Sequence, residues 1–273
     1  MGIDFHKYRP QKGIRTSLYQ RVFALTKNGS YKLFKSKWIL VLIILTYFFG
    51  VVTKLINLVF GSSNLESSFF IDFYEEGQLW FVLMAAVAGS GLIANDLKHR
   101  TVVLYLIRIP KKVYLAGKTG IIGSVLSVVI LLPGIILFFV AVVSSTEPWS
   151  TFVENLSILG AVAIMGMLII LLLSTVSLAI SSLTSDKRYA GAGIFIIFMF
   201  SDILSGLLRS IIDNDSLAMV SVWNNVRVVG RHLFGVETPY SYPWYDSLAV
   251  LAVVFISSAS ILYYTVFKKE VWV

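Results

Sequence analysis

The stretch VYLAGKTGIIGSVLSVVILLPGIILFFVAVV, residues 113–143, holds one charged side chain in 31 residues. A helix needs about 17 to 25 mainly apolar residues to cross a hydrocarbon layer of about 30 Å. Five further runs of the chain satisfy the same requirement. With the quoted stretch, the predicted spans are Trp38–Phe60, Gln78–Asn95, Val113–Val143, Thr151–Leu183, Tyr189–Leu208 and Trp244–Phe267. The sequence therefore predicts an all-α integral membrane protein with six transmembrane helices.

The composition of the whole chain agrees with this class. The mean hydropathy is +0.80, 57% of residues are hydrophobic and only 14% are charged. A water-soluble core of this length cannot bury so much apolar surface, so we expect residues 1–273 to form one transmembrane domain. The absence of cysteine excludes a disulfide framework and thiolate chemistry.

The positions of the cations predict the orientation in the membrane. Lys and Arg near span ends are retained in the cytoplasm, and with both termini inside, 19 of the 23 Lys and Arg residues are cytoplasmic. The exceptions are Lys54, Arg209, Arg227 and Arg231. The net charge of +8 is explained by this topology, so we expect no nucleic-acid partner. The predicted location is the cell (cytoplasmic) membrane, crossed several times.

A basic, amphipathic segment precedes the first span, within the cytoplasmic residues 1–37. Thr16 and Ser17 can cap a helix in which Leu18, Val22 and Phe23 share one face. The opposite face carries Gln20, Arg21 and Lys27. Such a helix is expected to lie on the inner membrane surface, in contact with lipid.

The connection between the second and third spans, residues 96–112, is rich in charge. Pro110 stops helix propagation, so we expect a helix from about Asp96 to Arg108 with Asp96 at its positive end. One face would carry Leu97, Thr101, Leu104 and Arg108, and its rim Lys98, His99, Arg100, Lys111 and Lys112. This pattern fits docking on a cytoplasmic partner, and it also fits a basic loop lying on anionic headgroups.

The chain here resembles the ABC-2 type permeases, six-span membrane subunits of ABC exporters. Many of these carry an acidic residue after the second span, then Gly-Thr, a leucine-rich turn, Pro with a basic residue, and a Lys at the start of the third span. The matching positions are Asp96, Thr101, Leu104, Leu106, Pro110, Lys111 or Lys112, and Lys118. Arg100 stands where the glycine is common, which is a departure from the pattern.

The resemblance implies that residues 96–112 form a coupling helix bound by a separate ATP-binding subunit. A second permease subunit, identical or related, would complete the transporter. ATP and Mg²⁺ would be held by the partner, with no cofactor bound directly here. The tripeptide Gly117-Lys118-Thr119 lacks the earlier glycine of a phosphate-binding loop, because residue 112 is Lys.

Small residues gather on particular helix faces. The third span carries Gly117, Gly120, Gly123, Ser124 and Ser127 on one face, and the second span carries Ala85 and Gly89. Such faces allow close helix packing, either within the bundle or between subunits.

Two ionisable residues fall inside the predicted spans. Lys54 and Asp202 lie at similar depths in the outer half of the bilayer, counted at about 1.5 Å per residue from the start of each span. We expect them to pair or to line a polar cavity. In the alternative, Lys54 extends outward and Asp202 bonds locally to Ser201 or Ser205.

Residues 209–243 form an extracellular or re-entrant segment between the last two spans. A helix here would carry Trp223, Val226 and Gly230 on one face and Arg227 with Arg231 on another. The two arginines could meet outer phosphates or an anionic substrate, or could serve as interfacial anchors.

The sequence favours transport over catalysis. Its three histidines are scattered, and no H-E-x-x-H motif or serine-histidine pair falls within the spans, so we expect no enzyme activity in this chain. The apolar spans favour export of a lipophilic substrate such as a lipid, peptide or drug. The alternative is an ion- or proton-coupled secondary transporter, in which Lys54 and Asp202 carry the coupling charge.

Overall fold

The computed structural model describes residues 17–60, 67–101, 105 and 109–268. Within these residues the secondary structure is helical, with no strand. The α-helices are α1 (Leu18–Phe34), α2 (Lys37–Thr46), α3 (Thr53–Phe60), α4 (Ser67–Glu76), α5 (Gln78–Lys98), α7 (Lys111–Leu126), α8 (Leu132–Val143), α9 (Pro148–Glu154), α10 (Leu156–Leu183), α11 (Lys187–Phe195), α12 (Ser201–Ile212), α13 (Val222–Leu233) and α14 (Trp244–Tyr263). A 3-10 helix covers Asp215–Val220.

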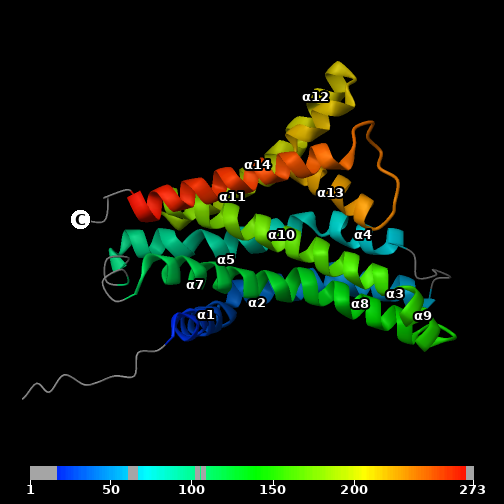
Figure 1. Cartoon of the computed structure of the whole chain (residues 1–273), viewed down its shortest axis with the longest axis horizontal. Helices are drawn as coiled ribbons and strands as arrows, with labels where there is room; N and C mark the ends of the chain where they lie inside the picture. Colours follow the sequence, from blue (N-terminus) through cyan, green and yellow to red (C-terminus); the bar gives the residue numbers. More distant parts are fainter. Residues whose placement is uncertain (1–16, 61–66, 102–104, 106–108, 269–273) are drawn as a thin grey trace, which may run out of the picture.

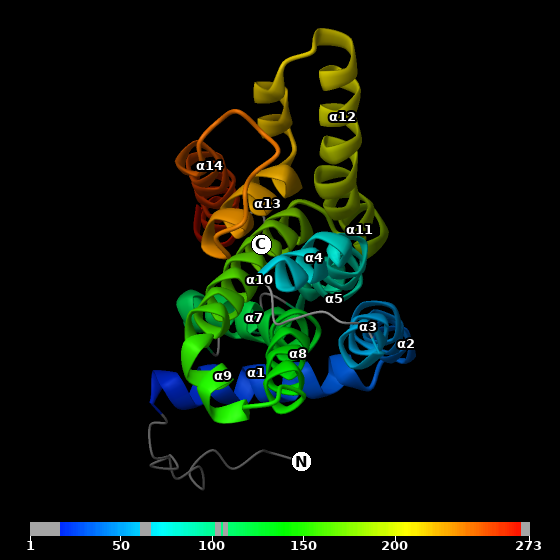
Figure 2. The same ribbon diagram turned by 90° about the vertical axis from the view of Figure 1, so that its right-hand side faces the viewer.

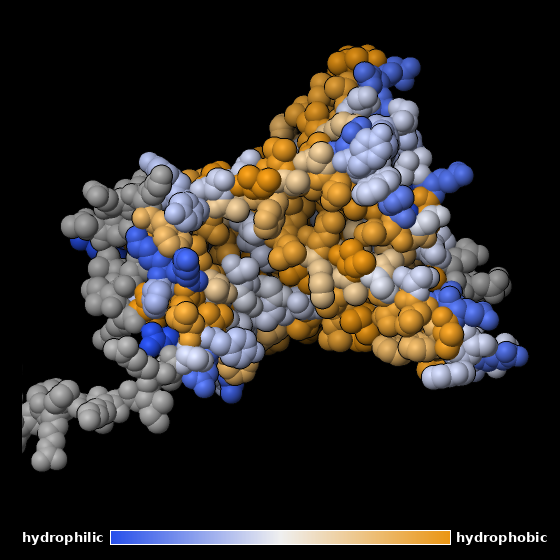
Figure 3. All heavy atoms as spheres, in the orientation of Figure 1, coloured by the Kyte–Doolittle hydropathy of each residue, from blue (hydrophilic) through white to orange (hydrophobic). Residues whose placement is uncertain are grey.

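In the described part of the chain, six helical stretches are long and apolar enough to cross a membrane. They are Lys37–Ile56, Gln78–Lys98, Lys111–Val143, Leu156–Leu183, Lys187–Ile212 and Trp244–Phe267. Hydrophobic residues cover the middle of the face seen in Figure 3, whereas hydrophilic residues gather at both ends. The predicted six-helix architecture is thereby confirmed in length, number and hydropathy.

The six stretches form one elongated bundle with two distinct ends (Figure 1). At one end, called the α1 end here, α1 lies beside the start of α7 and the last described residues follow α14. At the opposite end, called the α13 end, α4 and α13 pack together and α9 projects. The first and last described residues therefore lie at the same end of the bundle.

Helix α1 lies across the α1 end of the bundle, transverse to the spans (Figure 2). Its start is defined by a capping box, in which Ser17 accepts from the Gln20 backbone and the Gln20 side chain accepts from Ser17. This satisfies two N–H groups that a helix start otherwise leaves unpaired. The predicted cap at Ser17 and the helix behind it are confirmed.

Helix α1 packs against glycines of the third span. A Cβ on Gly117 would collide with Leu25, and one on Gly120 would lie 2.5 Å from the Thr26 hydroxyl oxygen. One turn further, the hydroxyls of Ser30 and Ser124 are 2.6 Å apart. Part of the small-residue face predicted on the third span is thus used for packing inside the chain, because only glycine allows this approach.

Helix α10 lies at the centre of the bundle, packed against α5, α11 and α14. Close packing with α5 depends on Gly89, whose Cβ would lie 2.6 Å from the Ser177 Cβ. Nearby, the Ser181 hydroxyl donates to the Ser90 carbonyl oxygen at 2.7 Å and accepts from the Ala94 N–H at 3.0 Å. A buried hydroxyl in an apolar bundle needs such partners, so these bonds fix the register of the two spans.

Wide π-helical turns interrupt several spans, at Tyr47–Val52, Ser127–Leu131, Ile196–Phe200 and Tyr264–Lys268. In the third span Leu132 donates its N–H to Ser127, five residues back. The next residue, Pro133, has no N–H to give to Val128. The Tyr47 hydroxyl donates to that Val128 carbonyl oxygen at 2.7 Å, so the first and third spans are linked at their π-helical turns.

Several span boundaries differ from the sequence prediction, and at two of them the backbone conformation explains the difference. The fourth span begins at Leu156 instead of Thr151, because α9 ends at Glu154 and Asn155 follows it with a non-helical backbone. The fifth span continues to Ile212, where Asp213 adopts a left-handed conformation with φ of 49°. Its second half, α12, leans away from the bundle (Figures 1 and 2) and exposes Ile203, Leu207 and Ile211.

Candidate functional site

The acidic residue that begins the predicted docking segment is part of a buried ion pair. Asp96 lies in the last turn of α5, and its Oδ2 is 2.6 Å from the Lys118 Nζ on α7. Lys118 also donates to the Leu92 carbonyl oxygen at 2.6 Å. The exposed fractions of the two side chains are 16% for Asp96 and 9% for Lys118. An ion pair with so little solvent exposure contributes stability only when both charged groups also have their other hydrogen-bond partners.

Two hydroxyl groups complete the surroundings of the Asp96 carboxylate. Tyr114 donates to Oδ2 at 2.8 Å, and Thr101 donates to Oδ1 at 3.3 Å. The Lys118 ammonium also lies 5.7 Å from the centre of the Tyr105 ring and 5.3 Å from that of Tyr114. Lys118 of the Gly-Lys-Thr tripeptide therefore serves as a buried counter-ion in this structure.

The predicted helix start at Asp96 is wrong. Helix α5 continues through Lys98, so Asp96 lies at the negative end of a helix and is compensated by Lys118. The helix ends because Arg100 turns into the left-handed region with φ of 54°, and its N–H donates to the Leu97 carbonyl oxygen. This is the position at which the resemblance noted above has a glycine.

Arg100 adopts a backbone conformation that costs a residue with a Cβ about 1 kcal/mol. We therefore expect Arg100→Gly to change the free energy of unfolding by at most about 1 kcal/mol, in the stabilising direction. Arg100→Ala keeps the strain and removes the same charge, so it is the matched control. Thermal unfolding of both variants in detergent measures the difference. A glycine variant less stable than the alanine variant would contradict the left-handed turn.

The predicted docking residues have different surroundings. Lys98, Arg100 and Lys112 are exposed at the α1 end, whereas Lys111 donates to the Phe267 carbonyl oxygen at 3.1 Å. Pro110 precedes α7 and caps it, since its carbonyl oxygen accepts from Val113 and Tyr114. Leu104 and Arg108 lie outside the described residues. Three of the predicted cations therefore form an accessible basic surface, defined by Lys98, Arg100 and Lys112.

A cavity of about 950 Å³ opens beside this surface, between α1, α2, α5, α7 and α11. Asp96, Lys118 and Tyr105 belong to its wall, so the buried ion pair faces it. Sequence reasoning missed this cavity, because its wall combines five helices that are distant in the chain.

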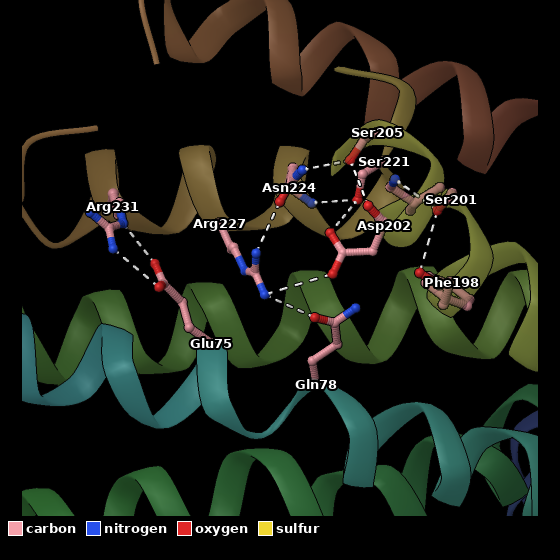
Figure 4. Close-up of polar contacts among 11 residues, drawn as sticks. Glu75, Gln78, Phe198, Ser201, Asp202, Ser205, Ser221, Asn224, Arg227 and Arg231 are labelled. Carbon is pink, nitrogen blue, oxygen red and sulfur yellow. Dashed lines mark hydrogen bonds and ion pairs between the residues drawn. The ribbon is translucent and has the colours of Figure 1, made fainter. Parts of the chain in front are cut away.

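A second polar network lies at the α13 end and joins α4, α5, α12 and α13 (Figure 4). Arg231 on α13 makes a two-pronged contact with Glu75, with Nε–Oε1 at 2.7 Å and Nη2–Oε2 at 3.1 Å. These bonds raise the pKa of Arg231. Four residues earlier, Arg227 donates to Gln78 and to Asn224, each at 3.0 Å.

Asp202 belongs to the same network. Its Oδ1 accepts from the Ser221 hydroxyl at 3.1 Å, and its Oδ2 is 3.9 Å from the Arg227 Nη2. The Lys54 Nζ instead lies 3.0 Å from the Glu76 Oε1. The predicted Lys54–Asp202 pair does not form, because α4 and α13 supply each residue with a different partner.

The two arginines of the 209–243 segment are directed into the protein. The predicted face of Trp223, Val226 and Gly230 is buried, as expected for the helix they form. Arg227 and Arg231, in contrast, contact the carboxylates and amides described above instead of facing outward as a pair. An outer anionic ligand would therefore have to compete with Glu75 and Asp202 for these guanidinium groups.

A metal centre is not formed by the residues that the structure describes, since no three His, Asp or Glu side chains among them are grouped to hold an ion. A scan against protein-family models finds no match for the chain, and a search of curated proteins finds no relative. The function must therefore be inferred from the geometry described above.

Proposed function

We propose that the chain is the membrane-spanning permease subunit of an ATP-driven ABC exporter that moves a lipophilic substrate. Residues 96–112 would dock on a separate subunit that binds ATP and Mg²⁺ and hydrolyses the nucleotide. The chain would lie in the cytoplasmic membrane, with its termini and the α1 end inside. A second permease subunit, identical or related, would complete the transport path.

The observation that carries this proposal is the position of the Asp96–Lys118 pair directly behind the basic surface. Lys98 and Arg100 follow Asp96 at the end of α5, and Lys112 precedes Lys118 by six residues on α7. Because the pair links the two spans at 2.6 Å, a displacement of the connecting segment would move α5 and α7 together. The exposed cations would supply the contact with the partner, where charge complementarity sets specificity and association rate.

Affinity purification from the native membrane in detergent tests the proposal. The eluate is assayed for ATP hydrolysis with the wild-type chain and with Lys98→Gln/Arg100→Gln/Lys112→Gln. We expect ATPase activity to co-purify with the wild type and to fall at least tenfold with the triple variant, because three charged contacts are lost at once. Lys27→Gln/Lys35→Gln/Lys37→Gln removes three exposed cations, one in α1, one directly after it and one at the start of α2, and it should retain the activity.

An ion- or proton-coupled secondary transporter is the second candidate. It is favoured by Asp202, a carboxylate in the fifth candidate span beside Arg227, whose Nε and the nearby Gln78 Nε2 are buried without a hydrogen-bond partner among the described residues. The purification distinguishes the two candidates. A stable wild-type chain that arrives with no ATPase in any sample would exclude the ABC assignment and favour this one.

A further inference from the structure

The cavity at the α1 end lies beside α5, at a place where α2 and α11 leave the surface of α5 partly uncovered. Helices α2 and α11 both pack on α5, on either side of it, with little contact between them (Figure 2). Small residues on the facing helices, among them Ala86, Gly91 and Ala192, form part of the wall. A Cβ added at Gly191 would meet the Ser90 Cβ at the ordinary contact distance of 3.7 Å, so α11 packs directly on α5 beside the cavity. A cavity of about 950 Å³ is at the upper end of the range for small-molecule sites.

The cavity is charged at one end and apolar at the other. Lys32 of α1 and Lys187 with Arg188 of α11 stand at the charged end, and all three side chains are exposed. Among the described residues of the wall, Asp96 is the one carboxylate, and it is paired with Lys118. The three outer cations therefore meet no carboxylate within the cavity, so the charged end is complementary to an anion.

The apolar end extends along the spans. It is lined by Leu42 of α2, Leu83 of α5 and Phe195 of α11. From Asn95 to Leu83 the axis of α5 rises about 18 Å, which is similar to the roughly 15 Å of hydrocarbon in one leaflet. Trp38, which also lines the cavity, is 74% exposed. The cavity thus has the length and the polarity gradient of one leaflet.

We propose that this cavity binds an anionic amphiphile with the chemistry of an acidic phospholipid, which enters sideways from the leaflet at the α1 end. Lys32, Lys187 and Arg188 hold the phosphate, and an acyl chain lies along Leu42, Leu83 and Phe195. Arg188 can pair with two phosphate oxygens at once, and lysines act as point charges. The inference names the substrate class of the permease proposed above, and in that respect it rests on the proposed function.

The fluorescence of Trp38 can report which lipid occupies the cavity. The full chain is placed in phosphatidylcholine nanodiscs that contain a small, increasing mole fraction of brominated phosphatidylglycerol or brominated phosphatidylcholine, since bromine quenches tryptophan fluorescence. The difference in fluorescence between the wild type and Trp38→Phe isolates the signal of Trp38. We expect half-quenching at a mole fraction of phosphatidylglycerol at least tenfold lower than that of phosphatidylcholine.

Two variants separate the charged end from the apolar end. Lys32→Gln/Lys187→Gln/Arg188→Gln should abolish the preference for phosphatidylglycerol, whereas the matched Lys27→Gln/Lys35→Gln/Lys37→Gln should keep it. Ala192→Phe, which keeps every charge and fills the cavity from an exposed position, should weaken quenching by both lipids at low mole fraction. Unchanged thermal unfolding of each variant shows that the fold is intact.

Three results would overturn the inference. Equal half-quenching by the two lipids would mean that the cavity is filled by bulk lipid. A preference that survives loss of the three cavity cations would place its origin elsewhere. Displacement of the brominated lipid by inorganic phosphate alone would show a site for free phosphate. No ATPase takes part in this assay, so its failure and the failure of the proposed function are distinguishable.

Discussion

Lys118→Met is expected to lower the free energy of unfolding by about 3–5 kcal/mol. The substitution leaves the Asp96 carboxylate at the end of α5, 16% exposed, without its cation. Breaking a buried ion pair from one side has this cost because the remaining charge stays in a poorly hydrated site. Tyr114 and Thr101 still donate to the carboxylate, which keeps the loss near the lower limit. Reversible unfolding in mixed micelles measures the change.

The double variant Lys118→Met/Asp96→Leu tests the cause of that loss. With both charges removed, no ion is left unpaired, so at least half of the lost stability should return. Lys112→Met is the matched control, since it removes an exposed cation from the same helix and should change stability by less than about 0.5 kcal/mol. If Lys118→Met changes the free energy of unfolding as little as Lys112→Met does, the Asp96–Lys118 pair is hydrated. In that case the pair does not couple the movement of α5 to that of α7.

Arg231→Ala is expected to destabilise the α13 end by about 2–3 kcal/mol. The Arg231 and Glu75 side chains are 24% and 19% exposed, so the loss should fall below that of a fully buried pair. Their two hydrogen bonds connect α13 with α4, helices that flank the bundle at this end. Arg231→Lys keeps the charge but cannot make both bonds, and it should lose about half as much.

Glu237→Ala is the control for Arg231. Arg231 also donates to the backbone carbonyl oxygen of residue 237, which an alanine retains, so stability should stay within about 0.5 kcal/mol of the wild type. Exchange of the pair, Glu75→Arg with Arg231→Glu, should recover part of the loss. Equal stability of Arg231→Lys and the wild type would show that the charge alone, and not the two-pronged geometry, is used.

The spans were predictable because each depends on a local property, a run of apolar residues. The ion pairs were not. Lys54 and Asp202 were expected to pair since they lie at similar depths, yet Glu76 and Arg227 reach them from helices outside or beside the spans. The sequence does not reveal how deeply α4 and α13 enter the bundle, so equal depth was an incomplete criterion.

The docking segment shows the same difference between local and distant information. Pro110, the exposed Lys98 and the basic rim follow from local sequence. The burial of Asp96 in the last turn of α5 is compensated by Lys118, which lies 22 positions further along the chain. Likewise, glycines at 117 and 120 predicted a close contact, but nothing in the pattern identified α1 as the helix that fills it.

The crossing of α1 over the third span also has a consequence for the order of assembly during synthesis. Thr26 and Ser30 meet Gly117 and Ser124, which lie 91 and 94 positions later. At a translation rate of about 5–20 residues per second, α1 leaves the ribosome roughly 5–20 s before its partner. During that interval the hydroxyls of Thr26 and Ser30 lack these partners on the third span. The first span must therefore begin to insert before α1 has packed against the third span. The packing of α1 at this end of the bundle is a late step of biogenesis.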